Sequence, residues 1–385
     1  MPKLYAYYYG GMHSCANRNR EAGRSVNEWD LLRHLPGRPQ PLLGYWDDSD
    51  TQTLSQEISL AQAYGVDGFI MNLYHNGSWA ELSKPVDAFC RQATGRDVGF
   101  ALNWCYRMPR RVMPVPLNYE KKKTAHLIHA VVEEGRNIHT DLTPAAISAL
   151  MNFCKPYFMH DQYIRVNNKH YFSLYHVTGL LRQYGADGLE VLLASIRAEA
   201  RRYGVELHIV GVLSVTPEDE AHNHEIRAAS FDALTAYCAL ADFKEGDYHQ
   251  DYAALYPKRV REWTICKDVY KKEFYPCLAA GWDASARGES GYDPALHGLV
   301  FPWAPVVKND TPANFRAYLD EALAYSRRED AAVILLGPWN EWSEGCYLLP
   351  DSRYGFGRLE AVREARQSFV NDHIKSTSAC TNQNP

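Results

Sequence analysis

The chain alternates between short apolar runs and longer stretches in which apolar residues recur every three or four positions. Short apolar runs bounded by turn residues predict buried strands, whereas the longer pattern predicts amphipathic helices. We expect strands near residues 4, 67, 99, 172, 208, 233, 276 and 334, separated by helical segments. Eight alternating units of this kind predict an α/β fold, a (β/α)₈ TIM barrel with long insertions in the loops that follow its strands.

Some predicted elements carry clear end signals. Asp50 can cap a helix over residues 51–64, which Gly65 ends, and Thr311-Pro312 begins another helix. Asn167-Asn168 lies between two short extended segments and predicts a tight hairpin turn. Further helices are expected over residues 82–92, 144–158, 189–203, 217–227, 252–270 and 357–370.

Other segments lack a regular period. Residues 13–50 predict a long loop, and residues 106–141 predict an insertion over one face. We expect one catalytic domain over residues 1–372 and a disordered Ser/Thr/Asn-rich tail over 373–385. An open doubly wound sheet is the main alternative to a barrel, but no glycine-rich phosphate loop follows any predicted strand.

Charge and cysteine content exclude several classes of partner. The chain has 41 Lys and Arg against 46 Asp and Glu, without a basic stripe, so we expect no nucleic-acid partner. The nine cysteines are an odd number, and Cys90, Cys154, Cys238 and Cys277 lie in apolar runs, which predicts reduced core thiols. Neither a signal peptide nor a long apolar span is found, so we expect no membrane insertion and a cytoplasmic protein, or a secreted one if the chain is trimmed.

The strongest candidate for chemistry follows the last predicted strand. The apolar run 331–336 stops at Gly337-Pro338, and Glu341 and Glu344 come next between tryptophans. In a helical turn, residues three apart share a face, so both carboxylates are expected to point toward one cavity. Glycoside hydrolysis needs two such carboxyl groups, and we predict both to be catalytic. Alternatively, both are ordinary acidic residues in the first turn of a helix.

Polar and aromatic residues gather where the strands are predicted to end. With 26 Tyr and 9 Trp, the chain is rich in rings that suit sugar faces, although many such rings only pack. Histidines at strand ends are equally compatible with a structural role, and Asp283 and Arg287 with a surface ion pair. No metal and no other cofactor is predicted. The predicted substrate-binding residues are Tyr7, Tyr9, Asn72, Tyr74, His75, Asn103, Trp104, His176, Tyr237, Trp282, Asp283, Arg287, Trp339, Asn340 and Trp342.

Several motifs together resemble a known family. The run W-N-E-W-S-E-G-C-Y-L-L-P-D-S-R-Y-G-F-G-R-L-E-A resembles the C-terminal signature of WbsX-like proteins, which are related to the endo-α-mannosidases of glycoside hydrolase family 99. L-G-Y-W-D, Y-G-V-D-G-F-I, F-A-L-N-W and G-W-D-A-S-A-R occur in the order that the family shows. The resemblance therefore spans residues 4–365.

This resemblance implies a barrel that cleaves an α-mannoside-like linkage of an oligosaccharide or polysaccharide with retention. It implies that Glu341 deprotonates the sugar 2-hydroxyl, which forms a 1,2-anhydro sugar, and that Glu344 is the general acid and then the base for water. Ser343 stands where the mannosidases usually have His, and the third strand ends in N-W-C-Y rather than a W-A-N-E-type run, so the substrate is not copied over. A glycosyltransferase of polysaccharide assembly and a non-catalytic glycan-binding barrel are the alternatives; no oligomeric state is predicted.

Overall fold

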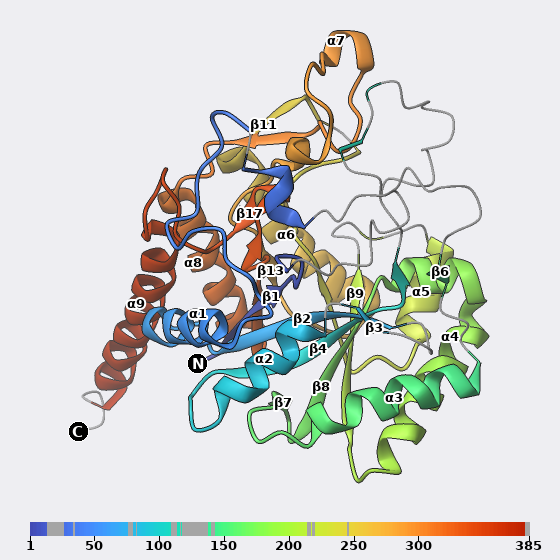
Figure 1. The fold of residues 1–385 in the computed structure, drawn as a ribbon. Helices are drawn as coiled ribbons and strands as arrows, with labels where there is room; N and C mark the ends of the chain where they lie inside the picture. Colours follow the sequence, from blue (N-terminus) through green and yellow to red (C-terminus); the bar gives the residue numbers. More distant parts are fainter. Residues whose placement is uncertain are drawn as a thin grey trace.

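The main sheet is built from parallel strands with helices between them (Figure 1). This computed structural model describes residues 1–13, 27–33, 35–75, 80, 81, 83–108, 114, 115, 117, 138, 139, 143–213, 217, 220–244 and 246–381. The strands of the main path are β1 (Lys3–Tyr8), β2 (Gly68–His75), β4 (Gly99–Cys105), β8 (Lys169–Tyr175), β9 (Leu207–Leu213), β10 (Ala233–Ala236), β12 (Glu273–Phe274), β13 (Cys277–Leu278) and β15 (Val333–Leu336).

Pairing across one interrupted strand closes this sheet into a barrel. β12 pairs with β10 and β13 pairs with β15, both in parallel, so the segment 273–278 joins the two ends of the path. Pro276 lies between the two halves and has no N–H to donate, so the strand is interrupted there. Because the segment supplies one barrel strand, the predicted (β/α)₈ fold is confirmed.

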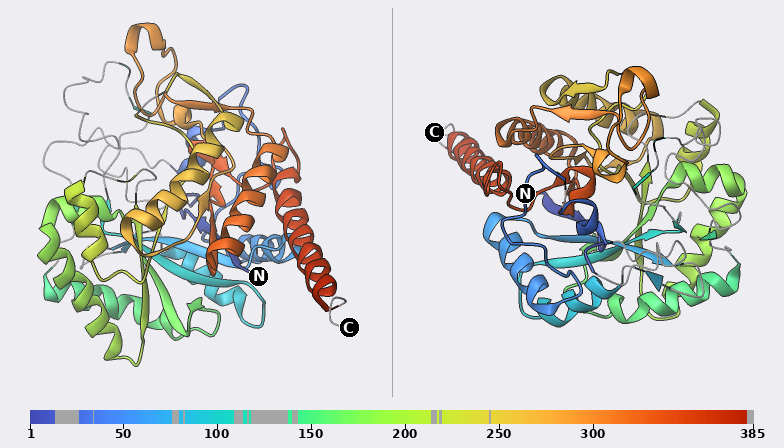
Figure 2. Two further views of the ribbon diagram at one scale, coloured as in Figure 1. Left: turned by 180° about the vertical axis from the view of Figure 1, so that it is seen from behind. Right: turned by 45° about the horizontal axis from the view of Figure 1, so that its top comes forward.

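Helices surround these strands (Figure 2). They are α1 (Thr51–Tyr64), α2 (Lys84–Ala93), α3 (Pro144–Phe158), α4 (Val177–Arg201), α5 (Glu220–Ala228), α6 (Tyr252–Tyr270), α8 (Pro312–Glu329) and α9 (Gly357–Thr381). α1 has the predicted ends, since the Asp50 side chain accepts from the Thr53 N–H and Gly65 has a φ of 83°. Asn167 and Asn168 both have positive φ in the hairpin of β7 (Arg165–Val166) and β8, as predicted.

Two helices are longer than the sequence pattern predicted. α4 begins at Val177 instead of residue 189, because the His176 ring accepts from the Gly179 N–H and caps the new first turn. Gly185 has a non-helical φ of 67° and marks the break that hid this first half. α9 continues to Thr381, so the helix extends into the stretch predicted to be a disordered tail. Residues 382–385 lie outside the described part of the chain.

The loops after the strands form a layer over one end of the barrel. It includes η2 (Glu28–Leu31), η4 (Ala284–Arg287), α7 (Pro294–His297) and the parallel pair β11 (His249–Asp251) and β14 (Val306–Lys308). α7 and β11 lie at the top of Figure 1. Of the predicted insertion 106–141, the structure describes the antiparallel pair β5 (Arg107–Met108) and β6 (Ile138–His139) and isolated residues; the rest lies outside the described residues.

The positions of the cysteines and the character of the helices bear on two of the sequence predictions. Cys90, Cys154, Cys238 and Cys277 are free thiols that lie in the core or pack against it, as predicted. Among the described residues, no helix combines the length and apolar character that crossing a membrane requires.

The carboxyl group of Glu57 is buried in the protein core. Glu57 of α1 is 1% exposed, and burial raises its pKa to about 8, with the charge of Asp48 raising it further. The folded protein therefore keeps the proton of Glu57 up to about pH 8. The unfolded chain, in which the pKa of this group is near 4.5, loses it at lower pH. The contribution of Glu57 to stability therefore falls as the pH rises from about 4.5 to about 8, because the native state binds this extra proton in that window.

We expect Glu57→Gln to remove this loss, because the amide stays uncharged at every pH. Glu57→Gln should raise the free energy of unfolding by about 2–3 kcal/mol more at pH 9 than at pH 5. This difference is somewhat less than the full pKa shift of Glu57 would give at about 1.4 kcal/mol per unit. Urea unfolding at both pH values measures it. Glu364→Gln, at an exposed glutamate, is the control. An equal effect of Glu57→Gln at both pH values would contradict the prediction.

Candidate active site

The two predicted catalytic carboxylates lie on a tight hairpin directly after β15. β16 (Asn340–Glu341) and β17 (Cys346–Tyr347) pair in antiparallel, and the 3₁₀ turn η5 (Trp342–Glu344) joins them. The predicted local helical turn is therefore present. Gly345 ends it with a φ of 60°, and a Cβ there would lie 2.9 Å from the Asp283 nitrogen, so the position needs glycine.

Backbone contacts fix this hairpin to the end of β1. The Asn340 side chain accepts from the Tyr9 N–H at 2.8 Å and donates to the Tyr9 carbonyl at 2.9 Å. The Trp339 N–H donates to the Tyr7 carbonyl at 2.6 Å. Both polar ends of the Asn340 amide bind the backbone, so this residue positions Glu341. The sugar-binding role predicted for Asn340 has no support from these contacts.

Arg287 occupies the centre of the site. Its side chain is 1% exposed, its Nε donates to the Ser343 hydroxyl at 2.7 Å, and its Nη1 pairs with Glu344. Its Nη2 lies 3.3 Å from Glu341 and 3.4 Å from Glu28. One guanidinium thus binds three carboxylates and a hydroxyl, instead of forming the surface pair with Asp283 that the spacing allowed.

Glu28 enters the site from a distant loop. It opens η2, which Asn27 and Asp30 stabilise through a capping box, and its carboxylate accepts from the Ser343 hydroxyl. The next residue, Trp29, is 1% exposed and packs against Trp342 with ring centroids 5.6 Å apart. This packing brings η2 onto η5, and with it the third carboxylate.

The charges of the cluster are unequal in number. Three buried carboxylates face one guanidinium. Burial alone would lower the pKa of Arg287, but Glu344, Glu28 and Glu341 outweigh this effect and raise it above its ordinary value. Arg287 is therefore a permanent cation, and the surplus of negative charge suits a site in which positive charge develops on a ligand.

A row of hydrogen bonds reaches Glu341 from the other side of the barrel. Asn72, Asn103 and Ser173 lie in register on β2, β4 and β8, so their side chains form one layer inside the barrel. The Ser173 hydroxyl donates to Asn103, which donates to Asn72, both at 2.8 Å. Asn72 donates to the Tyr237 hydroxyl at 3.1 Å, and Tyr237 donates to Glu341 at 2.9 Å.

This row has a single direction. Each member donates toward the next, and the last acceptor is the Glu341 carboxylate. Burial, and then the charge of Glu341, raise the pKa of Tyr237 well above its ordinary value, so the phenol keeps its proton and acts as a donor. The Glu341 carboxylate therefore accepts hydrogen bonds from one neutral donor, Tyr237, and one charged donor, Arg287.

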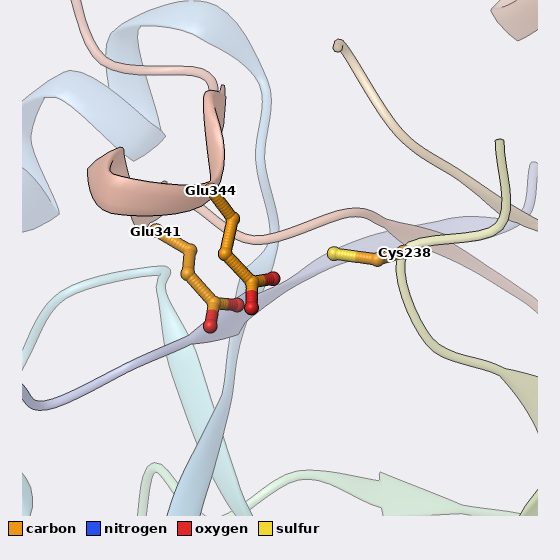
Figure 3. Close-up of side chains that lie close together, drawn as sticks. All are labelled: Cys238, Glu341 and Glu344. Carbon is orange, nitrogen blue, oxygen red and sulfur yellow. The ribbon is translucent and has the colours of Figure 1, made fainter. Parts of the chain in front are cut away.

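Cys238 points toward the two carboxylates (Figure 3). Its sulfur and single oxygens of Glu341 and Glu344 all lie within 4.8 Å of one another, a grouping compatible with a metal ion by distance. However, both carboxylates already bind Arg287, and burial, followed by the hydrogen bond with Cys346, raises the pKa of the Cys238 thiol. The two sulfurs are 3.5 Å apart. A protonated thiol is a poor ligand, and the absence of a metal remains a prediction.

Other predicted binding residues serve the structure of the barrel. The Tyr7 hydroxyl donates to the Ala236 carbonyl at 3.2 Å, and the Trp104 indole donates to the His75 carbonyl at 3.0 Å. Trp339 is fully buried against Phe69. These contacts are internal to the protein, so the sugar-binding role predicted for Tyr7, Trp104 and Trp339 has no support from their positions.

The ends of β2 and β8 carry three more predicted residues. His75 is 6% exposed, and burial lowers its pKa to about 4, so its ring is neutral near pH 7. Tyr74 is half-buried and lies in register with Glu81 of β3 (Ala80–Glu81). His176 caps α4.

Trp282, Asp283 and Trp342 line a cavity of their own. Asp283 caps η4, binds Arg38 at 2.8 Å, and donates its N–H to the Glu344 carbonyl at 2.7 Å. It therefore holds η4 against η5, and this contact delivers Arg287 to the carboxylates.

Sequence reasoning missed Glu28, Ser343 and Cys238 as parts of the site. Glu28 lies in a loop without periodicity, and no local signal relates it to residues near 340. Ser343 was noticed only as a departure from the mannosidases, whereas it joins Glu28 to Arg287. Cys238 directly follows the predicted site residue Tyr237, and this adjacency was the one available signal.

Known proteins resemble this chain in sequence and in fold. The family model described as "Glycosyltransferase WbsX" matches residues 4–362. The "Uncharacterized protein WxcX" of Xanthomonas campestris pv. campestris is 22% identical over 397 residues, which cover 98% of this chain and 52% of the relative. The chain thus spans about half the length of the curated relatives it matches.

Solved structures agree with the barrel. The GH99 endo-alpha-mannosidase from Bacteroides thetaiotaomicron has a TM-score of 0.59 at 14% identity, over 96% of this chain and 98% of that one. A protein described as "Glycoside hydrolase-like protein" has a TM-score of 0.59 at 15% identity, over 94% and 93% of the two chains. At this identity the likeness shows the fold, and the match over residues 4–362 shows that the chain belongs to the WbsX glycosyltransferase family.

Proposed function

We propose that the protein is a retaining glycoside hydrolase that cleaves an α-mannoside-like linkage of an oligosaccharide or polysaccharide. The observation that carries this proposal is the convergence of Glu341 and Glu344 on one buried guanidinium, at the carboxyl ends of the barrel strands. In TIM-barrel enzymes this end of the barrel carries the chemistry.

The separation of the two carboxylates favours retention. Glu341 and Glu344 have oxygens within 4.8 Å of each other. Retaining enzymes hold their carboxyl groups about 5–5.5 Å apart, whereas inverting enzymes need about 6.5–9.5 Å to admit a water molecule between them and the sugar. The short separation of Glu341 and Glu344 supports the retaining arrangement over the inverting one.

The environment of Glu341 supports its role as the base. Tyr237 and Arg287 both donate hydrogen bonds to its carboxylate and hold it in place as an acceptor. In the mechanism that the family resemblance suggests, Glu341 takes the proton of the sugar 2-hydroxyl, whose oxygen forms a bond to its own anomeric carbon as the glycosidic bond breaks. Glu344 gives a proton to the leaving oxygen.

The second step reverses these transfers. Glu344 takes a proton from water, the water oxygen bonds to the anomeric carbon, and the 1,2-anhydro ring opens. Glu341 returns its proton to the 2-oxygen.

Glycosyl transfer from a nucleotide sugar is the second candidate, because the family description names glycosyltransferases. Many such enzymes bind a nucleotide-bound metal through an Asp-x-Asp sequence. Asp48 and Asp50 form such a sequence here, but Asp48 is buried and binds His13 at 2.8 Å, and Asp50 caps α1. Their structural use favours hydrolysis over transfer.

Glu344→Gln should abolish sugar release from an α-mannoside substrate, because the amide can neither donate the proton to the leaving oxygen nor later activate water. We expect a loss of about 10²–10⁴-fold in kcat, measured by reducing-sugar assay on purified protein. Glu206→Gln changes an exposed glutamate paired with Arg201 and is the matched control. Full activity of Glu344→Gln refutes the assignment, and a thermal shift with nucleotide sugars but not with mannosides supports the transferase.

Tyr237→Phe should lower kcat about tenfold, since Glu341 loses a hydrogen bond worth roughly 1–1.5 kcal/mol. A steady-state assay of sugar release measures this loss. Tyr318→Phe, at an equally buried tyrosine whose hydroxyl donates to the Ala239 carbonyl, should leave kcat unchanged. An unchanged kcat in Tyr237→Phe would show that this phenol does not act through Glu341.

A further inference from the structure

A cavity of about 580 Å³ lies beside the carboxylate cluster. It falls within the range of about 300–1,000 Å³ that ligand pockets occupy in proteins. Its walls come from the loop after η2, from η4, from the segment between β14 and α8, and from the hairpin that carries the two glutamates.

The cavity and the carboxylate cluster share two walls. In η5 and its end, Trp342 and Gly345 line the cavity, while Glu344 binds Arg287. Asp283 and Ser285 of the η4 segment also line the cavity, and Arg287 at the end of η4 reaches the cluster. A ligand in the cavity would therefore lie next to the loops that carry Glu344 and Arg287.

Aromatic side chains make up much of the lining. They are Tyr248, Trp282, Trp342, Tyr347 and Tyr354. Trp342 stacks on Tyr347 with ring centroids 3.8 Å apart, which gives a rigid aromatic wall. Rings that combine an apolar face with a polar edge suit the faces of sugars, which have the same two kinds of surface.

The charged side chains of the lining have a positive surplus. Arg38, Lys308 and Arg353 face the carboxylates of Asp283 and Asp310. Arg38 pairs with Asp283 at 2.8 Å. Asp310 is already bound at 2.6 Å by Arg358, a buried arginine outside the lining, so its longer 3.5 Å contact with the half-exposed Arg353 satisfies that arginine poorly.

Lys308 is the remaining cation. It is exposed and has no carboxylate within ion-pair distance among the described residues. Close by, Thr311 lines the cavity and caps α8, an 18-residue helix without an acidic side chain in its first turn. The positive end of that helix adds to the two cations. The protein as a whole carries a net charge of −5, so this cationic cavity is a local feature.

We infer that this cavity binds a carboxylate-bearing sugar unit, a uronic acid, of the glycan on which the protein acts. The aromatic wall would hold the ring, and Lys308 and Arg353 would bind the carboxylate. The link to the glycan rests on the proposed function, whereas the binding of an acidic sugar does not. The protein would then select acidic polysaccharides by a unit next to the one it cleaves.

Isothermal titration calorimetry on the full chain carrying Glu344→Gln tests this inference. The probes are an oligosaccharide with one glucuronate unit, the same oligosaccharide with that carboxylate reduced to the neutral alcohol, and inorganic phosphate. We expect the acidic oligosaccharide to bind at least about tenfold more tightly than the neutral one, a difference near 1.4 kcal/mol. High salt should reduce this preference, because the cations are partly exposed.

Lys308→Gln and Arg353→Gln should each lower the preference, and the double variant should abolish it. Lys258→Gln, at an exposed lysine of α6, should keep it. Equal binding of both oligosaccharides, an unchanged preference in the double variant, or tighter binding of phosphate than of glucuronate would overturn the inference. Release of sugar by the wild-type chain is measured separately, so failure here leaves the proposed function intact, and the reverse also holds.

Discussion

The buried guanidinium of Arg287 is the contact on which the site depends. A charge taken out of water is costly unless it is paired and hydrogen-bonded, and an uncompensated buried charge costs several kcal/mol. Arg287 is the cation that all three carboxylates share, so its removal would leave them buried without it. Because Glu28, Arg287 and Glu344 come from three different loops, this shared cation also determines how η2, η4 and η5 pack.

Neutral hydrogen-bonding groups also hold Glu341 in place. The layer of Ser173, Asn103 and Asn72 is part of the barrel wall, and Tyr237 carries its hydrogen bonds across to Glu341. Glu341 is thus held from one side by a rigid sheet and from the other by a charged loop. Such double support is what keeps a catalytic group within a fraction of an ångström of its working position.

Local signals in the sequence were sufficient for the barrel and for the two glutamates. Caps such as Asp50 and left-handed positions such as Gly65 act within one turn of chain, so their residue types reveal them. The spacing of Glu341 and Glu344 after a buried strand is equally local. By contrast, Glu28 contacts Ser343 across 315 residues, and no periodicity encodes such a contact. Asn72 and Asn103 were found because they end strands, but that their amides bind each other follows from strand register.

The distance along the chain between Glu28 and Ser343 also matters during synthesis. The ribosome synthesises Glu28 before Arg287 and Glu344, so η2 is made before its partners in the cluster exist. Contacts of such high sequence separation form late in folding, since the chain between them must first be ordered. A chain that stops before Arg287 would keep Glu28 in water and leave η2 undocked. The carboxylate cluster can therefore assemble only after translation has passed Glu344.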